Sequence, residues 1–474
     1  MHISIKKTIL LVLISYSSTQ CVKVNPFVWF ADHDLVITDV SNTSVIPVSA
    51  IKKPKSIEEL KHIVMTANVP ISVAGGRYSQ GGQIAYRHGL VVDITELNAI
   101  KHFDPKNKTI TVETGITWRA IQNTIDPHNL SVKVMQSYND FTVGGSLSVN
   151  VHGRDINYGP LIQTIQSIKV LLADGTIVEA SRTQNADIFS AAIGGYGAIG
   201  IITEATISLT DNIKMKQIIK QMPVEQYAQH FLHEIKNNPH AVLHNGNLYP
   251  NDFKTVGSIT WYKTDEPVTE NTHLRPYETF YPMQMLGEQM LRRVAFLKKF
   301  RPSLEMKFLQ EKTVNWRNYE MSRTVNTLEP LIRFPTTTVL QEYFIPVNNI
   351  IPFINELRTI THDYGVNILN ASIRYVPQNT DSLLTYAPQE SFAFVLYINL
   401  VNTDEKLNQA QGWTRKLIDA ALNCGGTYYL PYQLFGTYEQ IGKAYPRLDE
   451  LRTIKKKYDP KNKFSNSLVT KYIA

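Results

Sequence analysis

Three clusters of glycine lie within the first 203 residues and constrain the fold of this chain more than any other feature. They fall at residues 75–82, 142–153 and 194–203. The first follows directly on a predicted strand, and consecutive backbone N–H groups in such a loop can bind an anion such as a phosphate pair. Glycine permits a close approach because it lacks a Cβ atom. The loop therefore predicts an anion-binding site, with a glycine-rich hairpin connection as the alternative.

The third cluster contains the pattern G-x-G-x-x-G at Gly195, Gly197 and Gly200. A dinucleotide-binding fingerprint of this form needs a strand before it, a helix after it and an acidic residue roughly 20 positions later. Here a helical stretch over 186–193 precedes the glycines, and a strand over 201–209 follows them. Because the order of the elements is reversed, the sequence argues against a Rossmann domain.

Length and composition bound the class of protein. A chain of 474 residues predicts two or three domains. With 43% hydrophobic and 19% charged residues it has the composition of a globular protein with a buried core, not of a fibre or a disordered tail. The two cysteines, Cys21 and Cys424, are too few for a disulfide scaffold or a cysteine-rich zinc site, and we predict no metal. The net charge of +7 is scattered, so we expect no nucleic-acid partner.

The first 22 residues have the pattern of a secretory signal peptide. Lys6 and Lys7 precede an apolar run over 9–14, and small polar residues follow at 17–19. This run is well short of the roughly 20 apolar residues that span a bilayer, and no other stretch of the sequence is a better candidate. We therefore expect export to the periplasm or secretion, with an N-terminal membrane tether or a buried N-terminal element as the alternatives.

Short helices and strands alternate from residue 45 to residue 213, which we interpret as the first domain. Ser56 stands at a helix N-cap position with Glu59 three residues later, the spacing of a capping box. Two β-rich runs over 165–172 and 177–180 flank an Asp-Gly turn and predict a β-hairpin.

From residue 214 to residue 429 the glycine-rich turns become rarer and the strands longer, and we interpret this part as a second, α+β domain. Residues 265–335 lack a clear pattern and predict a long helical or irregular excursion. The clearest predicted elements are two helices, over 225–236 and 349–364, and two central strands, over 339–345 and 392–398.

Four motifs occur in a characteristic order. After the first glycine loop come TVGGSLSVNVHGRD, IKVLLADGTIVEAS and DIFSAAIGGYGAIGIITEATISL, and residues 458–469 read YDPKNKFSNSLV. Together they resemble the vanillyl-alcohol oxidase and p-cresol methylhydroxylase family, whose FAD-binding domain is called PCMH-type. The resemblance is dense over residues 45–210, good over 430–474 and loose between them.

The resemblance implies an α+β fold in three parts. These are a two-lobed PCMH-type FAD-binding domain over residues 45–213, an α+β substrate cap domain over 214–429 and a C-terminal segment over 430–474 that returns to the first domain. The implied cofactor is FAD, with its pyrophosphate on the first glycine loop, its flavin and ribityl chain on the second cluster and its adenosine half on the third. The implied cofactor-binding residues are Ala74, Gly75, Gly76, Arg77, Tyr78, Ser79, Gln80, Thr142, Val143, Gly144, Gly145, Ser148, Asn150, His152, Gly153, Gly195, Gly197, Gly200 and Ile202.

One position departs from the family pattern. Many relatives carry a histidine in the first loop, in a run like G-x-R-H-S, and attach it covalently to the flavin. In this chain the run is Gly76-Arg77-Tyr78-Ser79, with a tyrosine in place of the histidine. A phenol is a much poorer partner for that linkage, so we expect FAD to bind non-covalently.

Five residues are implied as candidate catalytic residues. His152 lies in a run similar to one that places a histidine beside the flavin, and its charge equilibrium near pH 7 suits hydrogen bonding to a reacting hydroxyl. Arg374 and Tyr375 lie on a predicted strand that resembles a cap strand facing the flavin, with Tyr343 on a neighbouring strand. Tyr432 stands where relatives that oxidise lipid-linked ribose carry a lysine. The alternatives are core packing for the tyrosines and loop bracing for the histidine.

The resemblance implies an FAD-dependent oxidoreductase, either an oxidase or a dehydrogenase. It would take a hydride from a C–H bond next to a hydroxyl of a small polyol, sugar or lactone-like substrate onto flavin N5, with oxygen or another molecule as electron acceptor. A flavin-dependent reductase of carbon–carbon double bonds is the enzymatic alternative. A non-catalytic FAD-binding protein is the third hypothesis, because the linking histidine and the lysine are both absent.

Overall fold

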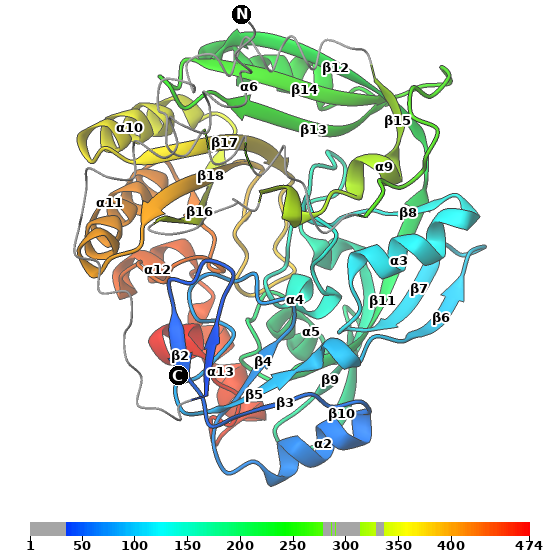
Figure 1. The fold of residues 1–474 in the computed structure, drawn as a ribbon, viewed down its shortest axis with the longest axis vertical. Helices are drawn as coiled ribbons and strands as arrows, with labels where there is room; N and C mark the ends of the chain where they lie inside the picture. Colours follow the sequence, from blue (N-terminus) through cyan, green and yellow to red (C-terminus); the bar gives the residue numbers. More distant parts are fainter. Residues whose placement is uncertain (1–34, 278–285, 287–289, 291–312, 329–335) are drawn as a thin grey trace, which may run out of the picture. The chain divides into compact units, whose positions relative to one another are not determined.

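The structure is a computed structural model that describes residues 35–277, 286, 290, 313–328 and 336–474. The predicted signal peptide over residues 1–22, with Cys21, lies outside the described residues, and so does much of the predicted excursion over 265–335. The described helices and strands belong to the unit Val36–Ala474 (Figure 1).

A small parallel sheet carries the first glycine loop. Its strands lie in the order β3-β5-β4. They are β3 (Ala50–Lys52), β5 (Leu90–Asp93) and β4 (Ile71–Ala74), with helix α2 (Ile57–Thr66) between β3 and β4 and a short hairpin, β1 (Val36–Thr38) and β2 (Val45–Pro47), ahead of them. The Ser56 side chain accepts a hydrogen bond from the N–H of Glu59, as its N-cap position predicts. The glycine loop begins where β4 ends.

The C-terminal segment lies against the edge of this sheet. The N–H of Ile71 donates to the carbonyl of Lys463 at 2.7 Å, and the N–H of Ser465 donates to the carbonyl of Ile71 at 2.9 Å. The hydroxyl of Ser72 donates to the carbonyl of Ser465 at 2.8 Å. The strand that leads into the first glycine loop is therefore held by residues almost 400 positions further along the chain.

The same segment also holds the third glycine cluster through a buried lysine. Lys455 lies on helix α13 (Leu448–Tyr458), and its ammonium group donates to the carbonyls of Ala198 and Phe464 at 2.9 and 2.8 Å. The carboxylate of Asp459, 3.0 Å away, balances its charge. Burial of a charged group is tolerated here because every partner is a strong acceptor.

A second sheet of six strands makes up most of the remaining first domain. It runs in the order β10-β9-β11-β7-β6, and β8 pairs with the end of β11. The strands are β6 (Ile100–Asp104), β7 (Thr109–Glu113), β8 (Leu130–Val132), β9 (Ile165–Leu171), β10 (Ile177–Ser181) and β11 (Ile201–Asp211). Strands β9 and β10 form the predicted antiparallel hairpin.

The second and third glycine clusters flank this sheet. Residues of the second cluster form a short helix, α4 (Val143–Ser148), where the sequence predicts only a glycine-rich segment. The Thr142 side chain accepts a hydrogen bond from the N–H of Gly145, and this N-cap stabilises the helix despite its two glycines. The third cluster lies between helix α5 (Ala186–Ala192) and β11, the order that argues against a Rossmann domain. Helix α3 spans Trp118–Ile125.

An antiparallel sheet of eight strands forms the second domain. Two residues separate its first strand along the chain from the end of β11. The order of its strands is β15-β12-β14-β13-β17-β18-β16-β19. The strands are β12 (Lys214–Pro223), β13 (Ala241–Leu248), β14 (Thr255–Lys263), β15 (Val314–Trp316), β16 (Thr336–Pro346), β17 (Asn367–Val376), β18 (Ser391–Val401) and β19 (Thr427–Tyr428). The two central strands predicted from the sequence are β16 and β18.

Helices cover one side of this sheet. Two of them, α10 (Ile350–Asp363) and α11 (Asp404–Asn423), lie side by side against β16 and β18 (Figure 1). Helix α10 was predicted, whereas α11 was not. The predicted helix over 225–236 corresponds to α6 (Val224–His230), which continues as a π-helical turn over Phe231–Ile235. Helices α9 (Arg317–Met321) and α12 (Tyr438–Ala444) complete the elements used below.

Both large sheets share one hydrophobic core. Ile168 on β9 and Phe394 on β18 belong to the same buried cluster, and both side chains are at most 1% exposed. The α+β class predicted from the sequence is confirmed. No helix in the described part of the chain combines the length and the apolar composition of a membrane span.

Candidate active site

A cavity of about 490 Å³ lies between the glycine clusters and one face of the eight-stranded sheet. Because side chains of a strand alternate between its two faces, every second residue of the central strands reaches it. On β16 these are Thr338, Leu340 and Glu342, on β17 Asn370, Ser372 and Arg374, and on β18 Val395 and Tyr397. The alternation decides which of the predicted cap residues contribute to the site.

The first glycine loop lines the cavity over its whole length from Gly75 to Gln80. A Cβ atom on Gly75 would collide with the Thr142 hydroxyl, so glycine is required for the loop to lie against the second cluster. Arg77 has a φ of 60°, in the left-handed region. Among the described residues, the N–H groups of Gly76, Arg77 and Ser79 have no protein acceptor. Unpaired, successive N–H groups around a left-handed residue form the concavity that binds phosphate oxygens.

The other two clusters meet the same cavity. Thr142, Gly144, Gly145, Ser148 and His152 line it from the second cluster. Gly197, Gly200 and Ile202 line it from the third, where a Cβ atom on Gly200 would lie 2.6 Å from the carbonyl of Leu171. Three segments that lie far apart in the sequence therefore bring small residues to one elongated surface.

Five predicted cofactor-binding residues do not line the cavity. They are Ala74, Val143, Asn150, Gly153 and Gly195. Val143 is fully buried in the core, and the Asn150 side chain accepts a hydrogen bond from the N–H of Ile162. A Cβ atom on Gly153 would lie 2.5 Å from the carbonyl of Met135, and one on Gly195 would overlap the carbonyl of Ala191. These residues shape the loops and do not form the surface of the site.

A buried acid, a histidine and a tyrosine form one hydrogen-bonded group at the cavity. Nε2 of His152 donates to Oε1 of Glu342 at 2.5 Å, and both side chains are 3% exposed. The hydroxyl of Tyr432 donates to Oε2 of Glu342 at 3.1 Å. Both carboxylate oxygens therefore accept hydrogen bonds, the arrangement that an ionised carboxylate favours.

The surroundings of Tyr432 determine its protonation. Burial raises the pKa of Tyr432 well above its ordinary value, and the nearby Glu342 carboxylate raises it further. The tyrosine therefore stays protonated and acts as a donor. When the His152 ring is neutral and its Nε2–H donates a hydrogen bond to the carboxylate, Nδ1 carries a lone pair. Nδ1 is buried and has no hydrogen-bond partner among the described residues.

Two further polar atoms of lining residues are also buried without a partner in the described chain. They are Nε of Arg374 and Nε2 of Gln136. Nη2 of Arg374 donates to the hydroxyl of Ser137 at 2.9 Å, and Oε1 of the Gln136 side chain accepts from the Ser146 hydroxyl at 3.1 Å. Each side chain is therefore anchored by a polar atom other than the unpartnered one. Buried polar groups are normally paired, so these atoms indicate positions that a bound molecule satisfies.

Two predicted catalytic residues, Tyr343 and Tyr375, do not reach the cavity, and the structure corrects both assignments. Tyr343 is adjacent to Glu342 on β16 and projects from the opposite face, where its ring packs against Phe353 of α10. Tyr375 is adjacent to Arg374 on β17, and its hydroxyl donates to Glu390 at 2.7 Å. Strand alternation places each of them on the wrong side.

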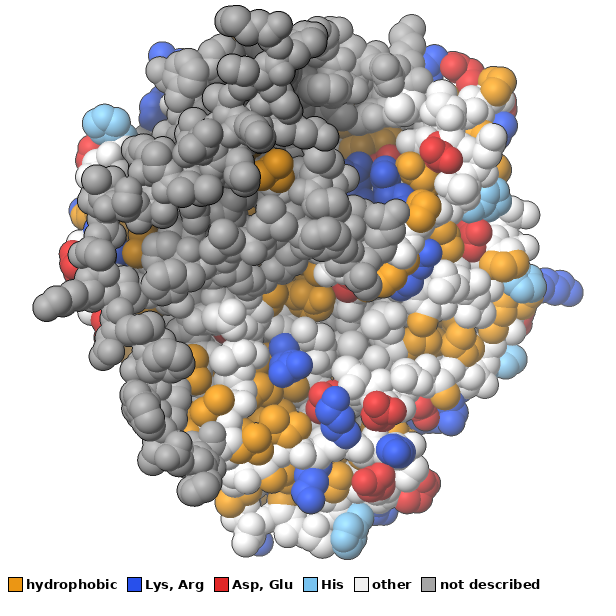
Figure 2. All heavy atoms as spheres, viewed as in Figure 1, with side chains coloured by type: hydrophobic (Ala, Val, Ile, Leu, Met, Phe, Trp, Pro, Cys, Tyr) orange, Lys and Arg blue, Asp and Glu red, His pale blue; other side chains and the backbone are white. Residues whose placement is uncertain are grey.

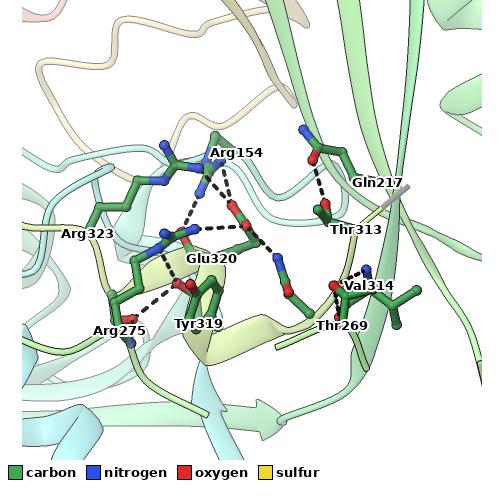
Figure 3. A network of polar contacts seen from close by, with 11 residues as sticks. Arg154, Gln217, Thr269, Arg275, Thr313, Val314, Tyr319, Glu320 and Arg323 are labelled. Atoms are coloured by element: carbon green, nitrogen blue, oxygen red, sulfur yellow. Dashed lines mark hydrogen bonds and ion pairs between the residues drawn. The ribbon is translucent and has the colours of Figure 1, made fainter. Parts of the chain in front are cut away.

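An excess of positive charge lies beside the cavity. The recess near α9 in Figure 2 gathers basic side chains, and Figure 3 shows three guanidinium groups converging on the carboxylate of Glu320. Arg275 and Arg323 each lie 3.2 Å from it, and Arg154 lies 3.8 Å from it. Burial would raise the pKa of Glu320, but Arg323, Arg154 and Arg275 lower it to about 2.

Sequence reasoning misses three functional candidates that the structure brings to the cavity: Glu342, Gln136 and Arg323. Glu342 carries a detectable signal, since it is the one charged residue of strand β16. Gln136 and Arg323 lie in segments without periodic pattern, and only the tertiary fold places them.

The site fits an extended cofactor with a phosphate pair. The unpaired N–H groups of the first loop suit anionic oxygens, and small residues of all three clusters line the same cavity. The unpartnered atoms of Gln136, His152 and Arg374 lie where a ring system with polar edges and a small substrate would meet them. The residues present therefore fit FAD.

Comparisons with known proteins cover most of the chain. The family model described as FAD binding domain matches residues 48–181, and the model described as D-arabinono-1,4-lactone oxidase matches residues 205–472, more than half of the chain.

Several curated proteins are similar to part of the chain. L-gulonolactone oxidase of Mus musculus is 30% identical over 158 residues, which cover 33% of this chain and 36% of that protein. Cytokinin dehydrogenase 1 of Arabidopsis thaliana is 30% identical over 203 residues, 41% of this chain and 35% of that protein. D-2-hydroxyglutarate dehydrogenase of Xanthomonas citri pv. viticola is 31% identical over 173 residues, 34% of this chain and 37% of that protein. Each match spans little more than a third of the relative.

Proposed function

Because the chain belongs to the PCMH-type FAD-binding family of oxidases and dehydrogenases, we propose that it oxidises a small molecule at a carbon that bears a hydroxyl group. The substrate class that we propose comprises polyols, sugars and lactone-like compounds, and oxygen or another molecule reoxidises the cofactor. The observation that carries this proposal is the buried group of Glu342, His152 and Tyr432 on the wall of the cavity.

FAD, when bound, supplies a hydride acceptor at flavin N5. Oxidation of an alcohol carbon also releases the hydroxyl proton, and the protein must provide a group that takes it. Nδ1 of His152 is the unpartnered acceptor at the cavity. Once it holds the proton, the imidazolium is stabilised by the Glu342 carboxylate, 2.5 Å from Nε2.

Tyr432 positions this acid. Its hydroxyl donates to the second oxygen of Glu342 and fixes the rotation of the carboxylate towards His152. The tyrosine does not take the proton itself, because its raised pKa keeps it protonated. The phenol in place of the lysine of some relatives therefore supports the carboxylate.

Arg374 orients the substrate in this proposal. It projects from β17 into the cavity, it is held at Nη2 by Ser137, and its Nε–H has no protein acceptor in the described chain. A guanidinium fork presents donors in a fixed plane, which suits a substrate oxygen. Loss of such positioning can slow a reaction by on the order of a hundredfold.

We further propose that FAD binds without a covalent bond. Tyr78 occupies the position of the linking histidine, and its ring stacks on Phe141 with the centroids 4.0 Å apart. This stacked phenol lines the cavity as an aromatic wall.

The test is anaerobic bleaching of the purified flavoprotein by a panel of polyols, aldoses and aldonolactones. Bleaching by one of them is expected to be fast in the parent and slower in His152→Ala. If reduced protein is instead reoxidised by an activated alkene, the chain is a reductase. If neither reaction occurs with full cofactor content, the chain is a non-catalytic FAD-binding protein.

A further inference from the structure

The charges that face the cavity are unequally distributed. Glu342 is balanced by its hydrogen bonds with His152 and Tyr432. Among the described lining residues it is the one carboxylate, whereas Arg323 and Arg374 both line the cavity. The cationic side therefore faces no acidic partner across the cavity within the described chain.

The environment of Arg323 adds to this imbalance. Among the described residues Glu320 is the one carboxylate of its cluster, and it is shared by Arg154, Arg275 and Arg323 (Figure 3). The cluster thus carries two more positive charges than negative ones. The Arg323 side chain is 46% exposed and lines the cavity.

Arg154 joins the cluster to Arg374. Burial, together with repulsion from Arg323, Arg374 and Arg275, lowers its pKa to about 9 against the attraction of Glu320. The positive charges are therefore close enough to repel one another. A concentration of like charge in a partly enclosed site lowers stability unless an anion offsets it.

We infer that the substrate carries a carboxylate, which binds to Arg323 and Arg374 while the hydroxyl-bearing carbon reaches His152. The inference rests on the proposed function and narrows its substrate class to hydroxy acids. A carboxylate suits Arg374 because its two coplanar oxygens match the edge of a guanidinium. His152 and the two arginines, which line the same cavity, then take the two polar groups of one small molecule.

The test compares binding of acids and matched neutral compounds to the oxidised holoprotein. The probes are hydroxy acids with three to six carbons, from glycerate to gluconate, each paired with the polyol of equal length, and glycerol 3-phosphate. Dissociation constants come from calorimetry and from the perturbation of the flavin spectrum. At least one acid is expected to bind about tenfold or more tightly than its polyol, since hydrogen bonds to charged groups are strong. Its affinity is expected to fall with salt, while that of the polyol stays constant.

Two variants locate the effect. Arg323→Gln is expected to weaken binding of the preferred acid on the order of tenfold and to leave the polyol unchanged. Arg447→Gln is the matched control, because Arg447 pairs with Glu450 on the surface and does not line the cavity. Flavin content and thermal unfolding are measured for both, and the salt dependence of the unmodified protein needs no variant.

The inference is overturned if no acid binds more tightly than its polyol, if Arg323→Gln weakens both equally, or if glycerol 3-phosphate binds in preference to the acids. Because these measurements use oxidised protein, they are independent of turnover. Arginine-dependent binding of an acid without flavin bleaching leaves the inference intact and contradicts the proposed function. Bleaching by neutral polyols without any preference for acids contradicts the inference and leaves the proposed function intact.

Discussion

Replacement of Glu342 by glutamine removes one charge and little else from the centre of the site. The parent carboxylate accepts from Nε2 of His152 at 2.5 Å and from the Tyr432 hydroxyl at 3.1 Å. In Glu342→Gln the positive charge that forms on His152 would lose its carboxylate partner. A hydrogen bond to a charged group contributes about 1.5–3 kcal/mol. Since 1.36 kcal/mol of barrier is a factor of ten, flavin reduction is expected to slow roughly 10- to 100-fold.

The assay is anaerobic rapid mixing with a reducing substrate, followed by the absorbance of oxidised flavin. The flavin-to-protein ratio checks that the variant retains its cofactor. Tyr343→Phe is the control, because Tyr343 is the next residue on the same strand and faces α10 instead of the cavity. It is expected to reduce at the parent rate. The reasoning is refuted if Glu342→Gln with full cofactor reduces as fast as the parent, or if both variants are slowed equally.

Four further predictions concern the cofactor, stability and export. Acid precipitation is expected to release the flavin, because Tyr78 replaces the linking histidine; flavin that stays with the denatured polypeptide would contradict this. Gly76→Ala is expected to lower the flavin-to-protein absorbance ratio and Gly412→Ala to leave it unchanged, because a Cβ atom at Gly76 would lie 2.7 Å from the Tyr78 ring and one at Gly412 meets nothing within 4 Å. Equal ratios would remove the loop from the cofactor site. Burial lowers the pKa of His244 to about 3 in the folded protein. In the unfolded chain a histidine has a pKa near 6.5, so as the pH falls the unfolded chain binds a proton at His244 that the folded protein does not. The free energy of unfolding is expected to drop by roughly 2 kcal/mol from this residue between about pH 6.5 and pH 5, and an equally steep decline in His244→Gln would refute it. A fusion of residues 1–30 to a reporter active only outside the cytoplasm is expected to give signal, and silence would contradict export.

Local signals in the sequence predict much of the fold. The Ser56 cap of α2 and the Asp-Gly turn between β9 and β10 depend on a few neighbouring residues, and both are confirmed. Helix α11 was missed although Thr403 caps it, because its apolar positions are interrupted by polar ones. Helix α4 was missed because its glycines disfavour a helix that Thr142 stabilises through its cap.

The site is less predictable, because it depends on which face of each strand meets the cavity. Choosing Tyr343 instead of Glu342 on β16 is an error of one residue, and one residue reverses the face. The same parity separates Tyr375 from Arg374, which does line the cavity. Arg323 lies beyond such reasoning, because its place at the cavity results from packing between segments distant in the sequence.

The contact between β4 and the C-terminal segment has a consequence for the order in which the protein matures. Ser72 and Ser465 are hydrogen-bonded across 393 positions, and the glycine loop starts three residues after Ser72, where the same short strand ends. During synthesis the ribosome must therefore produce residues 463–465 before this edge of the sheet can be completed. Contacts of such long sequence separation form late and slowly. Cofactor loading at this loop is accordingly an event that follows translation of nearly the whole sequence, and a nascent chain stalled before residue 463 would present the glycines without the support that holds them in place.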